Sequence, residues 1–82
     1  MLPNWLEEAL KTASYHRVQR LSNDKKWTLA MTAKALRRSI GSVCEDLLMA
    51  KWHKTHDLSQ FSHAYEAINF IKMKKKEMEL GE

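Results

Sequence analysis

Apolar residues recur at intervals of three or four positions between residues 28 and 52, which predicts two helices. Leu29, Ala33 and Leu36 share one face of the first helix. The second helix carries two adjacent apolar stripes, one of Val43 and Leu47 and the other of Cys44, Leu48 and Trp52. These stripes together predict a wide buried face on the second helix, with Cys44 in the core as a small hydrophobic residue.

Polar residues between the two apolar patterns predict a tight turn. Arg37 and Arg38 interrupt the apolar spacing, and Ser39 follows them as an N-cap, because its hydroxyl can accept a hydrogen bond from a free N–H group of the next turn. Helices over about 28–37 and 40–53 are then joined so closely that they must cross steeply. A corner of this kind, with basic residues in the turn, is typical of a helix-turn-helix.

The flanking segments predict one further helix each. A stretch over about 4–22 has an apolar stripe, with Asn4 as its N-cap and turn-forming residues at its end. After a polar connection, Asp57 and Gln60 have the spacing of a capping box and predict a last helix over about 58–79. We therefore predict an all-α fold of four helices, and the low content of two glycines and one proline agrees with it.

Length and composition predict one small globular domain over residues 1–82. A hydrophobic content of 44% with 29% charged residues is typical of a globular chain. The longest unbroken apolar run, residues 47–50, is far too short to span a membrane, and the N-terminus lacks the basic region of a signal peptide. The single cysteine cannot form an internal disulfide, so we expect a cytoplasmic protein.

Positive charge is concentrated in one part of the chain. The net charge is +4, but residues 11–38 carry eight basic residues against one aspartate, and they include all four arginines. A local excess of this kind is the electrostatic footprint expected for a polyanion. The alternative is an ordinary solvated surface rich in lysine.

The run from Thr32 to Ala50 resembles the helix-turn-helix of plasmid-partition and KorB-type DNA-binding proteins. That motif has an alanine, a leucine, a short turn, a capping serine, and then a valine and a leucine four residues apart. The corresponding residues in this chain are Ala33, Leu36, Ser39, Val43 and Leu47. Arg37 stands near the place where many such motifs carry a glycine. The resemblance implies double-stranded DNA binding, with the start of the second motif helix in the major groove.

Two kinds of DNA contact are expected from this motif. Basic side chains would neutralise phosphates, and side chains at the start of the second motif helix would contact base edges. The candidate set is Lys25, Lys26, Thr28, Lys34, Arg37, Arg38, Ser39, Gly41, Ser42 and Glu45. Gly41 would let the backbone approach DNA closely, and Glu45 could accept a hydrogen bond from a cytosine amine.

A protein of this kind would bind DNA either sequence-specifically or as an architectural factor. It would act as a small transcriptional regulator or as an accessory factor in partition or packaging, and its compactness suggests a phage or plasmid setting. The alternative is a plain helical corner inside a protein-binding bundle.

The residues before the motif have both a structural and a functional interpretation. Thr28 is expected to cap the first motif helix, and a helix N-terminus beside Lys25 and Lys26 is also a natural phosphate site. Trp27 is expected to be a core anchor that closes the helix over 4–22 onto the next one. Base stacking is the alternative for Trp27.

The last predicted helix is apolar on more than one face. A helix of this kind is buried on most sides, which in a chain this small predicts a homodimer with this helix in the interface. The candidate interface residues are Tyr65, Ile68, Phe70, Ile71 and Met73. The alternative is that the first helix and Trp52 cover it within one chain. A rival function follows from the same helix, namely a protein–protein adaptor that binds a polymerase or a packaging motor.

Catalytic and metal-binding patterns are not found in the sequence. It has no glycine-rich phosphate loop or dinucleotide fingerprint, and Cys44 has no base near it in the chain. His53, His56 and His63 lack the cysteines or the helical histidine pair of a metal site. We therefore expect a protein that is not an enzyme and that carries no cofactor or metal.

Overall fold

The fold is all-α, as the sequence predicts. A computed structural model describes residues 1–80, and within that range the chain forms four α-helices and one short 3-10 helix, with no strand. The elements are α1 (Asn4–Ser22), α2 (Leu29–Leu36), α3 (Ile40–His53), η1 (Leu58–Gln60) and α4 (Ala64–Leu80). None of the helices in this range combines the length and the apolar character that a membrane crossing requires.

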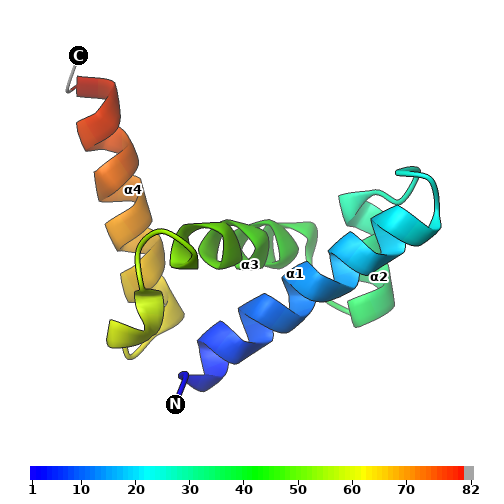
Figure 1. Ribbon diagram of the computed structural model, residues 1–82, viewed down its shortest axis with the longest axis horizontal. Coiled ribbons are helices and arrows are strands. Elements are labelled where there is room, and N and C mark those ends of the chain that lie inside the picture. The colour runs from blue at the N-terminus through cyan, green and yellow to red at the C-terminus, as the bar shows by residue number, and fades with distance from the viewer. Residues whose placement is uncertain (81–82) are drawn as a thin grey trace.

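Helix α3 is the centre of the molecule. It contacts α1, α2, η1 and α4, and α1 makes the most extensive of these contacts. Figure 1 shows α1 crossing α3, with α2 and the loop before it at one end of α3. The chain's N-terminus, η1 and α4 lie at the opposite end, and the C-terminal half of α4 extends away from the other helices. The chain therefore has two ends that can be described separately.

Of the N-caps predicted at Asn4, Thr28 and Ser39, the last two are confirmed. The Thr28 hydroxyl accepts a hydrogen bond from the backbone N–H of Met31 at 3.2 Å, and the Ser39 hydroxyl accepts one from Ser42 at 3.1 Å. The first prediction is wrong, because Asn4 is already helical and Pro3 occupies the N-cap position of α1 without a side-chain cap. Proline at this position costs no helical hydrogen bond, since the first N–H groups of a helix have no acceptor within the helix.

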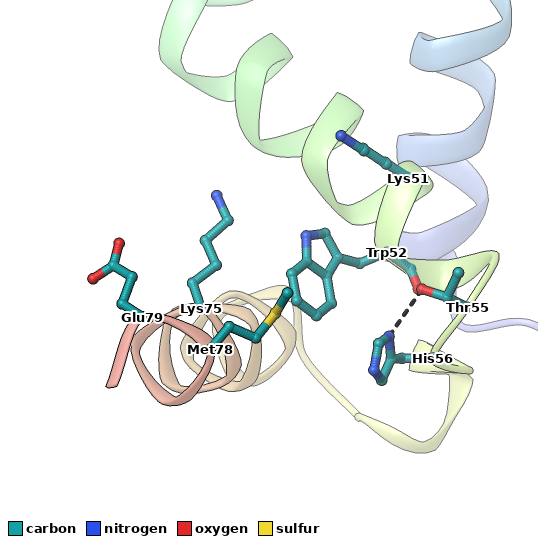
Figure 2. A pocket seen from close by; sticks show the side chains of 7 residues that line it. All are labelled: Lys51, Trp52, Thr55, His56, Lys75, Met78 and Glu79. Carbon is teal, nitrogen blue, oxygen red and sulfur yellow. Dashed lines mark hydrogen bonds between the residues drawn. The ribbon is translucent and has the colours of Figure 1, made fainter. Parts of the chain in front are cut away.

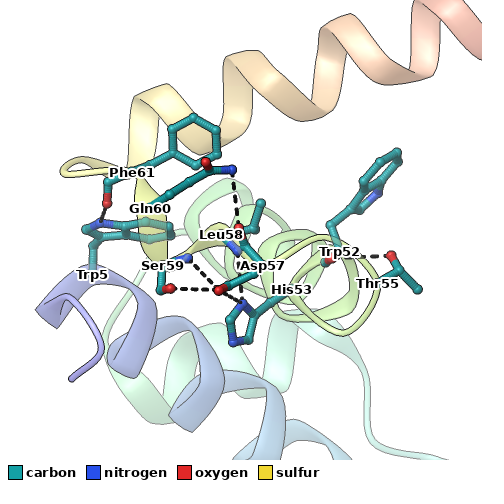
Figure 3. A network of polar contacts seen from close by, with 9 residues as sticks. All are labelled: Trp5, Trp52, His53, Thr55, Asp57, Leu58, Ser59, Gln60 and Phe61. Carbon is teal, nitrogen blue, oxygen red and sulfur yellow. Dashed lines mark hydrogen bonds and ion pairs between the residues drawn. The ribbon is translucent and has the colours of Figure 1, made fainter.

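The last helix begins later than the sequence predicts. Asp57 caps only the short η1 turn, where its Oδ1 accepts hydrogen bonds from the backbone N–H of Ser59 at 3.0 Å and from the Ser59 hydroxyl at 2.7 Å (Figure 3). The Gln60 side chain donates to the Asp57 carbonyl at 3.4 Å, so it does not return to the Asp57 N–H as in a capping box.

Phe61 is the residue that separates η1 from α4. Its backbone is extended, with φ −89° and ψ 135°, and its carbonyl accepts the Trp5 indole N–H at 3.1 Å (Figure 3). Helix α4 then starts after His63, whose backbone N–H donates to the Glu66 carboxylate at 3.0 Å. The predicted helix over 58–79 is thus two elements, because a contact with α1 stabilises an extended residue between them.

The main apolar core lies at the α4 end. Its buried members come from four elements and are Ala9, Met49, Leu58, Ala67, Ile68 and Ile71, with Trp5, Leu48, Trp52, Phe61, Ala64 and Phe70 packed around them. The predicted interface role of Ile68 and Ile71 is therefore wrong, because both are buried within one chain. Of the other candidates, Phe70 packs on this core and Tyr65 and Met73 are exposed. Homodimerisation stays a prediction.

The buried faces of α1 and α3 differ from those predicted. Cys44 is exposed, and the inward positions of α3 are Val43, Asp46, Met49 and Ala50. Helix α1 likewise buries two polar residues, Thr12 and His16, along with Leu6 and Ala9. The inward face of α3 therefore includes Val43 and Asp46 and leaves Cys44 outside.

Candidate nucleic-acid interface

The turn between α2 and α3 contains only residues 37–39. Arg37 adopts the left-handed conformation, with φ 56° and ψ 44°. The backbone N–H of Arg38 then donates to the carbonyl of Ala33 at 2.9 Å, which closes the end of α2 in a Schellman arrangement. Arg37 therefore has the backbone role that a glycine has in many turns of this kind. We call residues 37–39 with the adjoining ends of α2 and α3 the corner.

Arg38 is directed into the protein and does not lie free in the turn. Its guanidinium forms an ion pair with Asp46 of α3 and donates a hydrogen bond to the Thr12 hydroxyl of α1 at 3.2 Å. The Asp46 side chain is only 7% exposed, whereas that of Arg38 is 28% exposed. Arg38 thus joins the corner to α1 and α3 through its guanidinium. Sequence reasoning missed Asp46, because two adjacent acids on a helix suggest a solvated surface.

A second polar group fixes α2 against α1. The Trp27 indole N–H donates to the Thr32 hydroxyl at 2.6 Å, and the same hydroxyl lies 2.5 Å from Nδ1 of His16. Burial, and to a smaller extent the nearby Arg20, lower the pKa of His16, so the imidazole is neutral at pH 7. The neutral Nδ1 can accept a hydrogen bond from the Thr32 hydroxyl, while the hydroxyl oxygen accepts one from the Trp27 indole N–H. Trp27 is half-buried and lies outside the main apolar core, so it joins α2 through this polar contact and not as the core anchor that the sequence predicts.

Four of the candidate phosphate-binding side chains are exposed around the corner and the loop before α2. They are Lys25, Lys26, Lys34 and Arg37, and Arg17 and Arg20 of α1 are exposed as well. Asp24 and Lys25 both have positive φ, 53° and 64°, and form the tight turn that leads from α1 toward α2. Figure 1 shows this loop and the corner at the same end of the molecule. The backbone segments that carry Lys25, Lys26, Lys34 and Arg37 therefore lie at one end of α3.

The first turns of α3 combine capping residues with an open surface. The Ser39 hydroxyl, besides its cap, lies 2.9 Å from the Ser42 hydroxyl, so both serines are engaged locally. Gly41 and Glu45 are exposed. A Cβ placed on Gly41 would meet only the Ser39 hydroxyl, at 4.0 Å, so the fold itself does not require glycine there.

Two further residues of this surface were missed by sequence reasoning. Ile40 and Cys44 are exposed beside Gly41 and Glu45. The four positions follow the spacing of a single helical face, which was the available signal. It was overlooked because an apolar residue and a cysteine are usually assigned to a core.

The histidines from the end of α3 onward have local partners. Nδ1 of His53 accepts the backbone N–H of Leu58 at 3.1 Å and lies 3.6 Å from Asp57. The rings of His63 and Tyr65 are stacked with centroids 5.3 Å apart. Across residues 1–80, no three side chains of the histidine, cysteine, aspartate or glutamate type are grouped as a metal site would need.

Comparison of the chain with protein-family models, with curated proteins and with solved structures finds no match. Its function is therefore inferred from the residues and their geometry.

Proposed function

We propose that this protein binds double-stranded DNA through α2 and α3, with the first turns of α3 in the major groove. The observation that carries the proposal is the corner itself: two capped helices joined by three residues, beside an exposed helical face and a group of exposed cations. Such a domain would serve as a small transcriptional regulator or as an accessory factor in partition or packaging.

The exposed cations supply affinity in this proposal. Lys25, Lys26, Lys34 and Arg37 bind backbone phosphates, which releases counterions and makes binding strongly dependent on salt. Arg38 positions the corner through Asp46 and contacts no phosphate. Most of the candidate cations that the sequence suggested therefore remain in the contact set.

Sequence preference comes from the exposed face of α3. Ile40 and Cys44 offer apolar contacts suited to a thymine methyl group, and Glu45 is an acceptor suited to a cytosine amine. Glu45 also repels phosphates, so it weakens binding in any register where no base amine meets it. Gly41 leaves room for close approach, since glycine is not needed there for packing or for backbone conformation.

The first test measures binding of the purified protein to mixed-sequence duplex DNA across a salt series. The double variant Lys34→Ala with Arg37→Ala should bind more weakly and should lower the salt slope by about two, or about one for each phosphate that the variant no longer binds. The matched control, Lys72→Ala with Lys76→Ala, removes the same charge from exposed positions on α4 and should leave the slope unchanged. No binding of the wild type at low salt, or equal slopes for the two variants, would refute the proposal.

The second test uses Gly41→Ala. The added methyl group enters open space in the free protein and favours the helix by about 1 kcal/mol, so folding should be retained or improved. Binding to DNA should nevertheless weaken, because the methyl group lies where the backbone approaches DNA. Unchanged affinity in a well-folded Gly41→Ala variant would mean that this turn of α3 does not enter the groove.

A further inference from the structure

A cleft opens between the C-terminal end of α3 and the C-terminal half of α4, at the opposite end of α3 from the corner (Figure 2). Its volume is about 540 Å³, and its lining includes Lys51, Trp52, His56, Lys75, Met78 and Glu79. We call it the α3–α4 cleft. A cavity of this size accommodates one or two side chains of a partner.

The apolar part of the cleft continues the core onto the surface. Ile68 and Ile71 bury one face of α4, and Lys75 and Met78 follow on that face at helical spacing. This outer part of the face lines the cleft together with Trp52, and Met78 is 68% exposed. Figure 2 shows the end of the Met78 side chain turned toward the Trp52 ring.

Trp52 differs from the other two tryptophans in its polar contacts. The indole N–H of Trp5 donates to the Phe61 carbonyl, and that of Trp27 donates to Thr32. The indole N–H of Trp52 has no acceptor among residues 1–80, although its ring lies 4.9 Å from that of His56. The cleft therefore contains a hydrogen-bond donor beside an apolar surface.

Two ammonium groups border the same space. The side chains of Lys51 and Lys75 both line the cleft, the first from α3 and the second from α4 (Figure 2). Neither has an acidic partner within ion-pair distance in the described chain, whereas the neighbouring Lys74 is 3.4 Å from Glu77. The cleft thus combines two available cations and a donor with an apolar floor, and Glu79 is its one acidic group.

We propose that the α3–α4 cleft binds an acidic segment of a partner protein. An aliphatic or aromatic side chain of the partner packs on Trp52 and Met78, and adjacent carboxylates bind Lys51 and Lys75 and accept from the Trp52 indole. The charge complementarity selects an acidic partner. The apolar floor favours a peptide over a nucleic acid, because the ring of Trp52 already packs against that of His56 and is less available to stack on a base.

The test is a selection from a display library of random peptides of about twelve residues, with the full chain as bait. We expect the selected peptides to carry aspartate or glutamate around one apolar residue. Synthetic labelled copies of them are then titrated by fluorescence anisotropy. The double variant Lys51→Glu with Lys75→Glu should bind them on the order of tenfold more weakly.

A matched control separates the cleft from general charge. Lys54→Glu with Lys76→Glu makes the same change in net charge at exposed positions outside the lining and should leave affinity nearly unchanged. Circular dichroism of both double variants checks that they fold. Failure to enrich any peptide, enrichment of basic or purely polar peptides, or equal loss in both variants would overturn the proposal. Stronger binding of single-stranded oligonucleotide than of the selected peptides would overturn it as well.

Discussion

The buried polar side chains of the described chain lie at the α2 end of α3, whereas the main apolar core lies at the α4 end. These polar residues are Thr12, His16, Thr32 and Asp46. The corner is joined to the other helices by the Arg38–Asp46 ion pair and by the contact of Thr32 with His16 and Trp27. The α4 end is held by a compact cluster in which Leu58 and Ile71 are fully buried. The same helix is thus fixed by two kinds of interaction.

The polar contacts and the apolar core therefore have different effects, the first on the orientation of the corner and the second on stability. Hydrogen bonds and ion pairs are directional, so they define the orientation of the corner, although their net contribution to stability is modest. Apolar burial is not directional, but it supplies most of the free energy of folding. We therefore expect substitutions at the α4 end to lower mainly the free energy of unfolding. Substitutions at the corner should lower it less, but they should disturb the geometry of the proposed DNA contact.

The largest expected effect comes from Leu58→Ala. This side chain is fully buried between α3 and α4, so its truncation should lower the free energy of unfolding by about 2–5 kcal/mol. Denaturant unfolding measures the loss. Leu80→Ala is the control, because Leu80 is exposed and its truncation should change little. Similar losses in the two variants would contradict the position of the core.

A smaller effect is expected at the corner, and it should be asymmetric. Arg38→Ala leaves the Asp46 carboxylate buried without its partner and should cost about 1–3 kcal/mol. Asp46→Asn keeps an acceptor for Arg38, which is partly solvated, and should cost less. Denaturant unfolding of both variants measures which one loses more free energy of unfolding. A larger loss for Asp46→Asn would contradict the expectation that the buried carboxylate is the group that needs its partner. For both variants, the loss in free energy of DNA binding should exceed the loss in free energy of unfolding.

The smallest expected effect is a dependence of stability on pH. The pKa of His16 is lowered in the fold from its ordinary value of 6.5, so the unfolded chain takes up the proton at a higher pH than the folded one. The contribution of His16 is therefore fully present above about 6.5 and is lost as the pH falls toward the lowered value. Thermal unfolding should show a lower midpoint at about pH 5 than at about pH 7.5. In His16→Gln this part of the decrease should be absent, and an unchanged decrease would assign it to other groups.

Local features of the fold could be predicted from the sequence. Thr28 and Ser39 are helix caps because a hydroxyl next to the start of a helix satisfies an N–H group a few residues away, and this depends only on neighbouring residues. The bounds of α1, α2 and α3 agree with the prediction for the same reason. The position of Lys25, Lys26, Lys34 and Arg37 at one end of α3 could also be predicted, because these residues lie within a short stretch of the sequence.

Contacts between distant residues could not be predicted. The apolar pattern of α3 is compatible with either of two neighbouring faces, and only packing against α1 places Asp46 inside and Cys44 outside. His16 and Thr32 are 16 residues apart, and no spacing rule relates them. The break before α4 depends likewise on a hydrogen bond between Trp5 and Phe61.

The left-handed backbone of Arg37 has a consequence for how this sequence has been optimised. A glycine adopts those angles freely, whereas any residue with a Cβ is destabilised there by roughly 1–2 kcal/mol. The chain therefore carries a positively charged side chain at a position where a smaller residue would give a more stable domain. Arg37→Gly is therefore expected to stabilise the domain, while it removes one of the exposed cations at the corner.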